Sequence, residues 1–197
     1  PTLATFALVA LFAAAAVWQH ARMQSKEALG ARFAAAARIA PVALPQDVDD
    51  LTPWRYRNVT LAGRYDAPRQ ILIDNRIEGG RVGFHVVTPF ELDDGRAVLV
   101  DRGFVAAGAS RAQLPVVPVP EGERVVRGHI ELPARYVELD DASPSGSLWQ
   151  NLDPARFAQV TGIDVLPVVI AEDAADAPGD GLVRNWPPPD LGAARNY

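Results

Sequence analysis

The side chains in this sequence best suited to bind a metal or a haem iron are its three histidines, His20, His85 and His129. No two of them lie at the spacing of a metal site, and none belongs to an H-E-x-x-H motif. His85 and His129 fall in stretches with a strand pattern, where a hydrogen-bonded histidine is commoner than a ligand. His20 follows an apolar run, so its imidazole could ligate a haem or serve as a polar group at a membrane interface. We therefore predict no metal site and treat His20 as a candidate haem ligand.

Arg102 is the charged residue whose surroundings are most unusual, because the run 97–105 around it is otherwise apolar except for Asp101. At strand period it shares a face with three apolar residues, Val98, Val100 and Phe104. An unpaired buried charge is costly, so we expect the guanidinium to be buried and to have a carboxylate or carbonyl partner. Asp74 is one candidate. A structural ion pair is favoured over an anion-binding or partner-binding site.

Residues for covalent or acid–base catalysis form no recognisable constellation. The chain has no cysteine, which removes disulfides, thiolate metal sites and cysteine nucleophiles. No serine lies in a G-x-S-x-G motif, and the glycines form no phosphate loop. The adjacent carboxylates at 49–50, 93–94 and 140–141 fit solvated turns better than acid–base pairs. We therefore predict no catalytic residue and no enzymatic activity.

The elements that must position these residues are mainly short β-strands. The strongest signal is a hairpin, in which apolar residues alternate from Val82 to Leu92, Asp93-Asp94-Gly95 makes the turn, and a second strand follows. Strands are predicted at 55–65, 70–76, 82–92, 96–106, 124–132 and 165–171. Such spacing predicts a mainly β (α+β) fold, an antiparallel β-sandwich or barrel-like domain.

One short helix is predicted among the strands. Asp153 can cap its N-terminus, Pro154 suits the first turn, and Gly162 can end it. The proline-rich stretch 114–120 is predicted to be an extended connector, because proline has no N–H to donate to a sheet.

The N-terminal stretch predicts a long helix. Residues 2–18 are uncharged and mostly apolar, close to the lower limit of about 17 residues for a membrane span. A cleaved signal peptide is the alternative, but the helical pattern continues past Trp18, which suits a membrane interface. We expect one nearly continuous helix over 3–38, ended by Pro41.

This pattern divides the chain into a transmembrane helix (1–18), a helical arm (19–40), a linker (41–53) and a β-rich domain (54–190). Residues 191–197 would either form a loose tail or lead into a second span after Tyr197. Four of the 19 basic residues lie within 1–38, so the rest of the chain is more acidic than the overall net charge of −5. An acidic domain repels a phosphate backbone, which argues against a nucleic-acid partner.

Short motifs follow one another in a fixed order along essentially the whole chain. They are Trp18-Gln19-x-x-Arg22 with Lys26 and Leu29, Gly63-Arg64-Tyr65, Asn75-Arg76, Gly80, Gly83-Phe84 with Val86, Thr88-Pro89, Gly95, Val98 to Val105 with Arg102-Gly103 at its centre, Gly128, Trp149 and the closing proline-rich segment. In these motifs and their order the chain resembles the Surfeit locus protein family of cytochrome c oxidase assembly factors. Asp101 and Ala106 depart mildly from the family pattern. The resemblance implies a second membrane helix after Tyr197, which in the family opens with a histidine implicated in haem a binding, so that histidine cannot be carried over onto a residue of this sequence.

The resemblance implies a non-enzymatic assembly factor in a bacterial inner membrane, with its β-domain in the periplasm. Its partners would be the lipid bilayer and cytochrome c oxidase subunit I or its assembly intermediates. It would aid subunit I maturation, with haem a as a possible transient cofactor. The alternatives are a membrane-anchored periplasmic enzyme and a haem-free protein-binding β-module.

Overall fold

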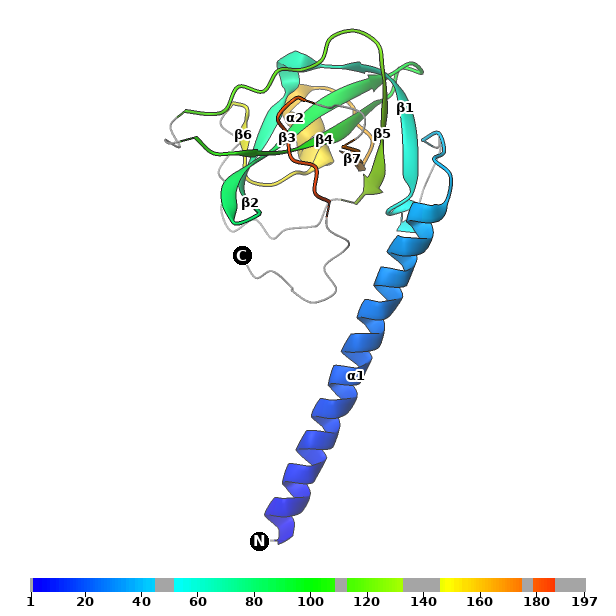
Figure 1. Ribbon diagram of the computed structural model, residues 1–197, viewed down its shortest axis with the longest axis vertical. Helices are drawn as coiled ribbons and strands as arrows, with labels where there is room; N and C mark the ends of the chain where they lie inside the picture. The colour runs from blue at the N-terminus through cyan, green and yellow to red at the C-terminus, as the bar shows by residue number, and fades with distance from the viewer. Residues whose placement is uncertain (1, 45–51, 109–112, 133–145, 175–178, 187–197) are drawn as a thin grey trace. The chain divides into compact units, whose positions relative to one another are not determined.

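The computed structural model describes residues 2–44, 52–108, 113–132, 146–174 and 179–186 (Figure 1). Contacts divide the chain into two units, one containing the N-terminal helix and the other spanning Ile39–Trp186. The two units are described separately below.

The N-terminal unit contains helix α1, Thr2–Arg38, a single unbroken helix. Alanine, leucine, arginine and glutamine have high helix propensity, and no proline interrupts them before Pro41. The predicted continuous helix over 3–38 is therefore confirmed. No helix in the described part of the chain is both long and apolar enough to cross a membrane. The membrane span at residues 1–18 stays a prediction.

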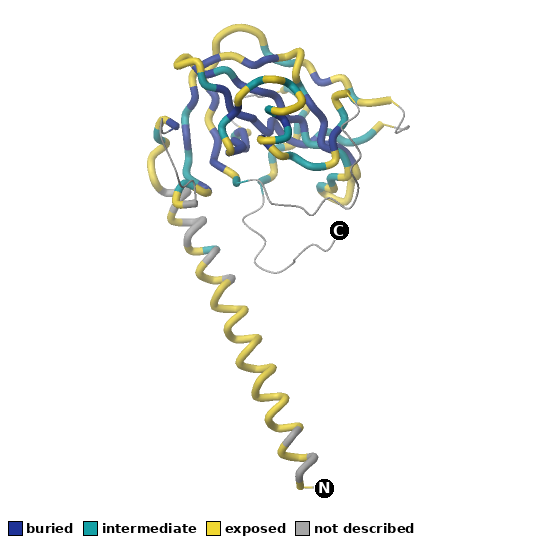
Figure 2. Tube along the Cα trace, turned by 180° about the vertical axis from the view of Figure 1, so that it is seen from behind, coloured by how far each residue is buried: buried dark blue, intermediate teal, exposed yellow. Residues whose placement is uncertain are grey.

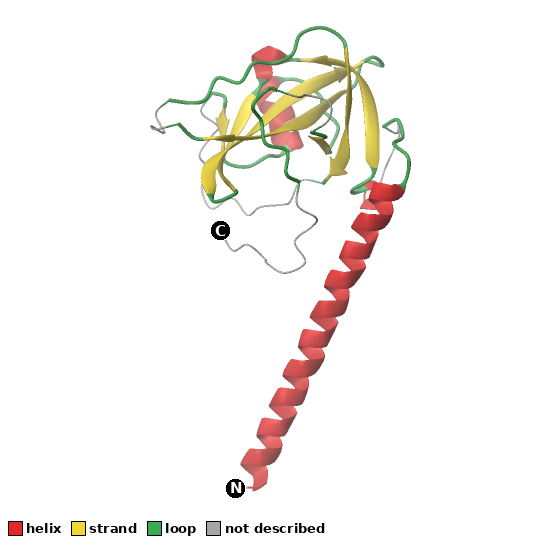
Figure 3. Cartoon of the chain, viewed as in Figure 1, coloured by secondary structure: helices red, strands yellow, loops and turns green. Residues whose placement is uncertain are grey.

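The described residues of the second unit form a β-domain with seven strands and one short α-helix. Figure 3 draws its strands in yellow. The strands are β1 Asn58–Tyr65, β2 Ile71–Glu78, β3 Arg81–Leu92, β4 Ala97–Ala106, β5 Arg124–Glu131, β6 Leu148–Trp149 and β7 Val169–Glu172. Two 3-10 turns, Thr52–Trp54 and Ala67–Arg69, precede β1 and β2, and helix α2 is Pro154–Thr161. All six strands predicted from the sequence are present, and the two-residue strand β6 was missed.

The sheet closes on itself. Its order is β1-β5-β7-β4-β3-β2-β6, and an additional pairing joins β1 to β3. Five strands, β1, β5, β7, β4 and β3, therefore form a barrel, and β2 and β6 continue the sheet outside it. Most pairings are antiparallel, whereas β7 runs parallel to β4. Of the two predicted architectures, the barrel is the observed one.

Apolar clusters on the two faces of β4 explain its nearly uninterrupted apolar sequence. All five barrel strands contribute to the cluster that fills the interior, which includes Leu61, Phe90, Val100, Ile130 and Ile170. A second cluster on the outer face brings together Val87, Leu99, Val169, Trp149 of β6 and Phe157 of α2. A strand covered on both sides is apolar on both sides. Figure 2 shows the buried strands of the domain in dark blue.

Helix α2 follows its local signals. The Asp153 side chain accepts hydrogen bonds from the backbone N–H groups of Ala155 and Arg156. Pro154 occupies the first turn, and Gly162 ends the helix with φ of 73°. A left-handed residue at this position is usually glycine, because glycine has no Cβ to clash. All three predicted roles are confirmed.

Part of the segment assigned to a linker belongs to the β-domain. Val42 forms a parallel bridge with Val59, and two backbone hydrogen bonds of 3.1 Å join Val42 to Asn58 and Thr60. Leu44 is buried in the barrel cluster. These contacts lie along β1, so residues 42–44 extend the packing of that strand. Residues 45–51 of the same segment lie outside the described part of the chain.

Candidate functional site: a buried charged network

Arg102 lies at an irregularity in the central hairpin. In the β3–β4 register Val86 is opposite Gly103 and Val87 is opposite Asp101, so Arg102 has no residue opposite it. This is a β-bulge, which inserts one extra residue into a strand and re-aims the side chains around it. Gly103 has φ of 123°, a conformation that side-chain-bearing residues rarely adopt. The bulge thus directs a charged side chain from an apolar strand into the interior.

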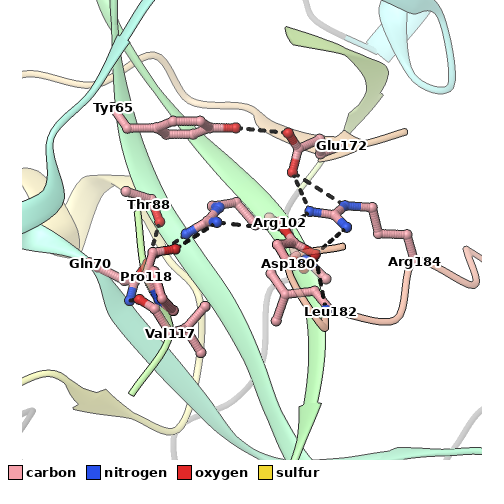
Figure 4. Close-up of polar contacts among 12 residues, drawn as sticks. Tyr65, Gln70, Thr88, Arg102, Val117, Pro118, Glu172, Asp180, Leu182 and Arg184 are labelled. Carbon is pink, nitrogen blue, oxygen red and sulfur yellow. Dashed lines mark hydrogen bonds and ion pairs between the residues drawn. The ribbon is translucent and has the colours of Figure 1, made fainter. Parts of the chain in front are cut away.

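The Arg102 side chain is only 1% exposed and is paired, as predicted. Its Nη1 donates to Gln70 Oε1 at 2.9 Å, and its Nη2 donates to the Pro118 carbonyl at 3.0 Å (Figure 4). Asp180 Oδ2 lies 3.6 Å from Nη2, and the guanidinium carbon stands 5.3 Å from the centre of the Tyr65 ring.

The prediction that Asp74 pairs with Arg102 is wrong. Its Oδ1 accepts from the backbone N–H of Asn75 at 2.6 Å. The β2–β3 register shifts between Ile73 and Arg76, and Asn75 has φ of 60°. This second irregularity uses the Asp74 carboxylate locally, in a turn-like contact that short Asx side chains commonly make.

A second buried arginine completes the network. Arg184 Nη2 donates to Glu172 Oε2 at 2.9 Å, and Arg184 Nη1 donates to Asp180 Oδ1 at 2.9 Å. The Tyr65 hydroxyl donates to the other oxygen of Glu172 at 3.0 Å. Two arginines therefore face two carboxylates, and the charges within this network balance.

The sequence reasoning missed five members of this network: Tyr65, Gln70, Glu172, Asp180 and Arg184. The sequence held one signal for Glu172: this charged residue directly follows the apolar run 168–171. Arg102 likewise lies among apolar residues in its strand. Nothing local marks Gln70 or Arg184, because they reach the network only through the tertiary fold.

The electrostatics of the network fit a structural role. Burial raises the pKa of Glu172, and its contacts with Arg184 only partly offset this. Burial also lowers the pKa of Arg102, which the nearby Tyr65 and Glu172 partly offset. Burial and the neighbouring Glu172 raise the pKa of the Tyr65 phenol well above its usual range, which makes it a poor proton donor. Each of these groups is bonded to another, so the network stabilises the fold and offers no free nucleophile or base.

His85 and His129 both lie close to the Trp186 ring. The Trp186 ring centre stands 5.7 Å from that of His85 and 6.3 Å from that of His129. Its indole N–H donates to the Glu172 carbonyl at 2.7 Å. Trp186 therefore fastens the segment that follows β7 to the barrel.

His85 is held by two carboxylates. Its Nδ1 lies 2.7 Å from Asp101 Oδ2, and its Nε2 lies 3.4 Å from Glu78 Oε1. The pKa of His85 is raised above its usual value. Burial alone would lower this pKa, but the negative charge of Asp101 and its hydrogen bond to the ring have the larger combined effect. Each ring nitrogen of His85 faces a carboxylate, so neither is left to bind iron and His85 does not fit a haem ligand. Within the described residues no group of three or more histidine or acidic side chains could hold a metal ion.

The remaining predicted site residues lie on α1 and in the β-domain. His20 is exposed on α1, with its Nε2 3.1 Å from Gln24 Nε2. Arg22 stacks over Trp18 at 5.4 Å, and Gln19 is exposed beside them. One exposed imidazole could supply a single axial ligand, so His20 stays a predicted haem ligand.

Arg76 and Gly103 belong to the β-domain. Arg76 lies on β2, near enough for its charge to oppose protonation of His85. A Cβ at Gly103 would stand 2.8 Å from the Val183 carbonyl. Val183 and Phe104 exchange two backbone hydrogen bonds of 2.8 Å, so Gly103 permits the close approach of the segment that carries Arg184 and Trp186.

Comparison with known proteins identifies the family. The sequence model of the SURF1 family matches residues 6–196. The chain belongs to the SURF1 family. It is 29% identical over 179 residues to Surfeit locus protein 1 of Takifugu rubripes, covering 82% of this chain and 74% of that protein. It is 32% identical over 195 residues to a SURF1-like protein of Drosophila melanogaster, covering 85% and 62%.

Other SURF1-family relatives are also longer than the matched region. Surfeit locus protein 1 of Mus musculus is 30% identical over 185 residues, which cover 82% of this chain and 58% of the mouse protein. The chain thus spans little more than half of that relative. The residues of the charged network all fall inside the family match.

Proposed function

We propose that this SURF1-family protein is a non-enzymatic, membrane-anchored assembly factor for haem-copper cytochrome c oxidase. It would aid maturation of subunit I by assisting insertion of haem a, which is cargo in this scheme. The observation that carries the proposal is the family match over residues 6–196. A bacterial inner-membrane location, with the β-domain in the periplasm, is part of the same proposal.

The chemistry of the β-domain supports a scaffold over an enzyme. Arg102, Arg184 and Glu172 are almost fully buried and bonded to one another or to neighbouring groups. Catalytic groups must reach a substrate, whereas buried and mutually paired charges hold segments in place.

A haem-free protein-binding module is the second candidate, and one observation favours it. Both ring nitrogens of His85 face carboxylates, so this histidine of the barrel is unsuited to iron. If haem contacts the protein, His20 on α1 is the candidate ligand, and the β-domain would then act by contacting a protein partner.

The test uses the full-length gene in a strain that lacks it. Deletion should lower the haem a absorbance of the membranes and the amount of assembled oxidase, and the gene should restore both. Normal oxidase in the deletion strain would refute the assembly role. The purified full-length protein and its His20→Ala variant would be compared by absorbance after haem a addition, with His129→Ala as the matched control. Haem bound by the control but not by His20→Ala supports cargo binding at α1, and no haem bound by any form favours the haem-free module.

A further inference from the structure

Residues 114–120, in the connector between β4 and β5, form an apolar stretch without a charged side chain. Their sequence is LPVVPVP, and no residue in this stretch pairs with a strand. Val116 is 93% exposed, the highest value among the large apolar side chains that the structure describes. Val117, the next residue, is buried against Leu72, Phe84 and Val86. An exposed apolar side chain, Val116, therefore lies directly beside a buried one, Val117.

The anchoring comes from the buried network. Gln70 Nε2 donates to the Val117 carbonyl at 3.0 Å, and Arg102 Nη2 donates to the Pro118 carbonyl at 3.0 Å. Gln70 and Arg102 are themselves bonded at 2.9 Å, and Thr88 Oγ1 donates to the same Gln70 oxygen (Figure 4). Gln70 and Arg102, which are bonded to each other, thus donate hydrogen bonds to the carbonyls of two consecutive residues in a surface segment.

This arrangement stiffens the connector. Proline fixes φ at Pro115, Pro118 and Pro120, and the two gripped carbonyls fix the register of the segment between them. A segment held in its extended form loses little conformational entropy when it binds. Burying the Arg102 guanidinium costs desolvation free energy, and this cost suggests that the position of the segment it binds matters for function.

The geometry points to residues 114–120 as a docking surface for a protein partner that has an aromatic-lined groove. Proline-rich extended segments dock in such grooves, and Pro115-Val116-Val117-Pro118 has the P-x-x-P spacing. The prolines lack an N–H, and two carbonyls are already bonded, so addition of a β-strand is disfavoured. The absence of charge gives a phosphate or an acidic peptide nothing to bind. Arg102 and Gln70 are positioning residues for this surface.

Photo-crosslinking in cells tests the docking surface. A benzophenone amino acid replaces Val116 in the full-length protein, and the control places it at Val160, an apolar residue that is 56% exposed on α2. We expect a protein adduct at 116 that maps to a peptide with tryptophan or tyrosine, is absent at 160, and is lost in a Pro115→Ala, Pro118→Ala background. Adducts with lipid alone, equal protein adducts at both positions, or no adduct would overturn the inference.

Gln70→Glu tests the positioning role. This variant keeps an acceptor for Arg102 and Thr88 but loses the donor to the Val117 carbonyl. Loss of one hydrogen bond predicts an adduct yield at 116 lower by about fivefold. The NMR order parameter of the Val116 amide should fall, while that of Val160 should not change. Unchanged mobility and adduct yield at 116 would contradict it.

The inference rests on the proposed function only for the identity of the partner. A mapped adduct with a protein unrelated to the oxidase would uphold the docking surface and contradict the assembly role. If deletion abolishes oxidase assembly but the Val116→Asp variant keeps normal oxidase levels, the assembly role is upheld and the docking surface is contradicted.

Discussion

Removing the Arg102 side chain is the sharpest test of the buried network. Arg102→Ala deletes two hydrogen bonds from a charged donor and leaves the Pro118 carbonyl without that partner. Gln70 Oε1 keeps its bond from Thr88, and Asp180 keeps its bonds from Arg184, so the loss is confined to part of the network. Breaking a buried pair from one side costs about 3–5 kcal/mol, and we expect Arg102→Ala to lower the free energy of unfolding by that amount.

Arg102→Met is the matched control. It keeps most of the side-chain volume and removes the cost of burying a charge, and the chief remaining penalty is the unpaired Pro118 carbonyl, about 1–3 kcal/mol. The measurement is urea unfolding of the full chain followed by tryptophan fluorescence, because Trp149 and Trp186 both lie in the β-domain. A loss below about 1 kcal/mol for Arg102→Ala would show that the pairing described above does not stabilise the fold.

Three further predictions address other parts of the β-domain. The raised pKa of His85 means that its stabilising contribution is complete below its unfolded pKa of about 6.5 and is lost as pH rises through the higher folded value, so His85→Phe should flatten the pH dependence of the urea midpoint in that window. Gly83→Ala places a Cβ 2.1 Å from the Val105 carbonyl and should destabilise by about 1–3 kcal/mol, whereas Gly108→Ala meets nothing within 4 Å and should be neutral by the same assay. Asp153→Ala removes the cap of α2 and should cost about 1 kcal/mol, and no change in the unfolding midpoint would contradict this.

Features of the fold that depend on nearby residues were predictable from the sequence. Helix α2 was placed correctly because its cap, its proline and its terminal glycine are all local signals. The burial of Arg102 was predictable because a charge inside an apolar strand must be paired. Its partners were not, because Gln70, Pro118 and Asp180 come from three separate segments that only the closed barrel brings together.

Irregular pairing limited the rest. The β1–β3 contact that closes the barrel involves only three residue pairs, Gly63–Leu92, Arg64–Glu91 and Tyr65–Phe90, so strand pattern could not separate a barrel from a sandwich. The prediction that Asp74 pairs with Arg102 was wrong because the register of β2 against β3 shifts between Ile73 and Arg76, and the alternation of apolar residues does not indicate this shift. Strand β6 was missed because a two-residue strand carries no period.

The position of β7 has a consequence for how the chain reaches its native state. This strand, Val169–Glu172, is inserted between β4 and β5, both of which precede it in the sequence. Until it arrives, β4 and β5 each present an open edge, and an open edge can pair with another chain. Biosynthesis therefore passes through an unsealed intermediate that persists until nearly the whole β-domain has been synthesised. Closure by such distant contacts is slow, and chaperones that shield strand edges would act in that interval.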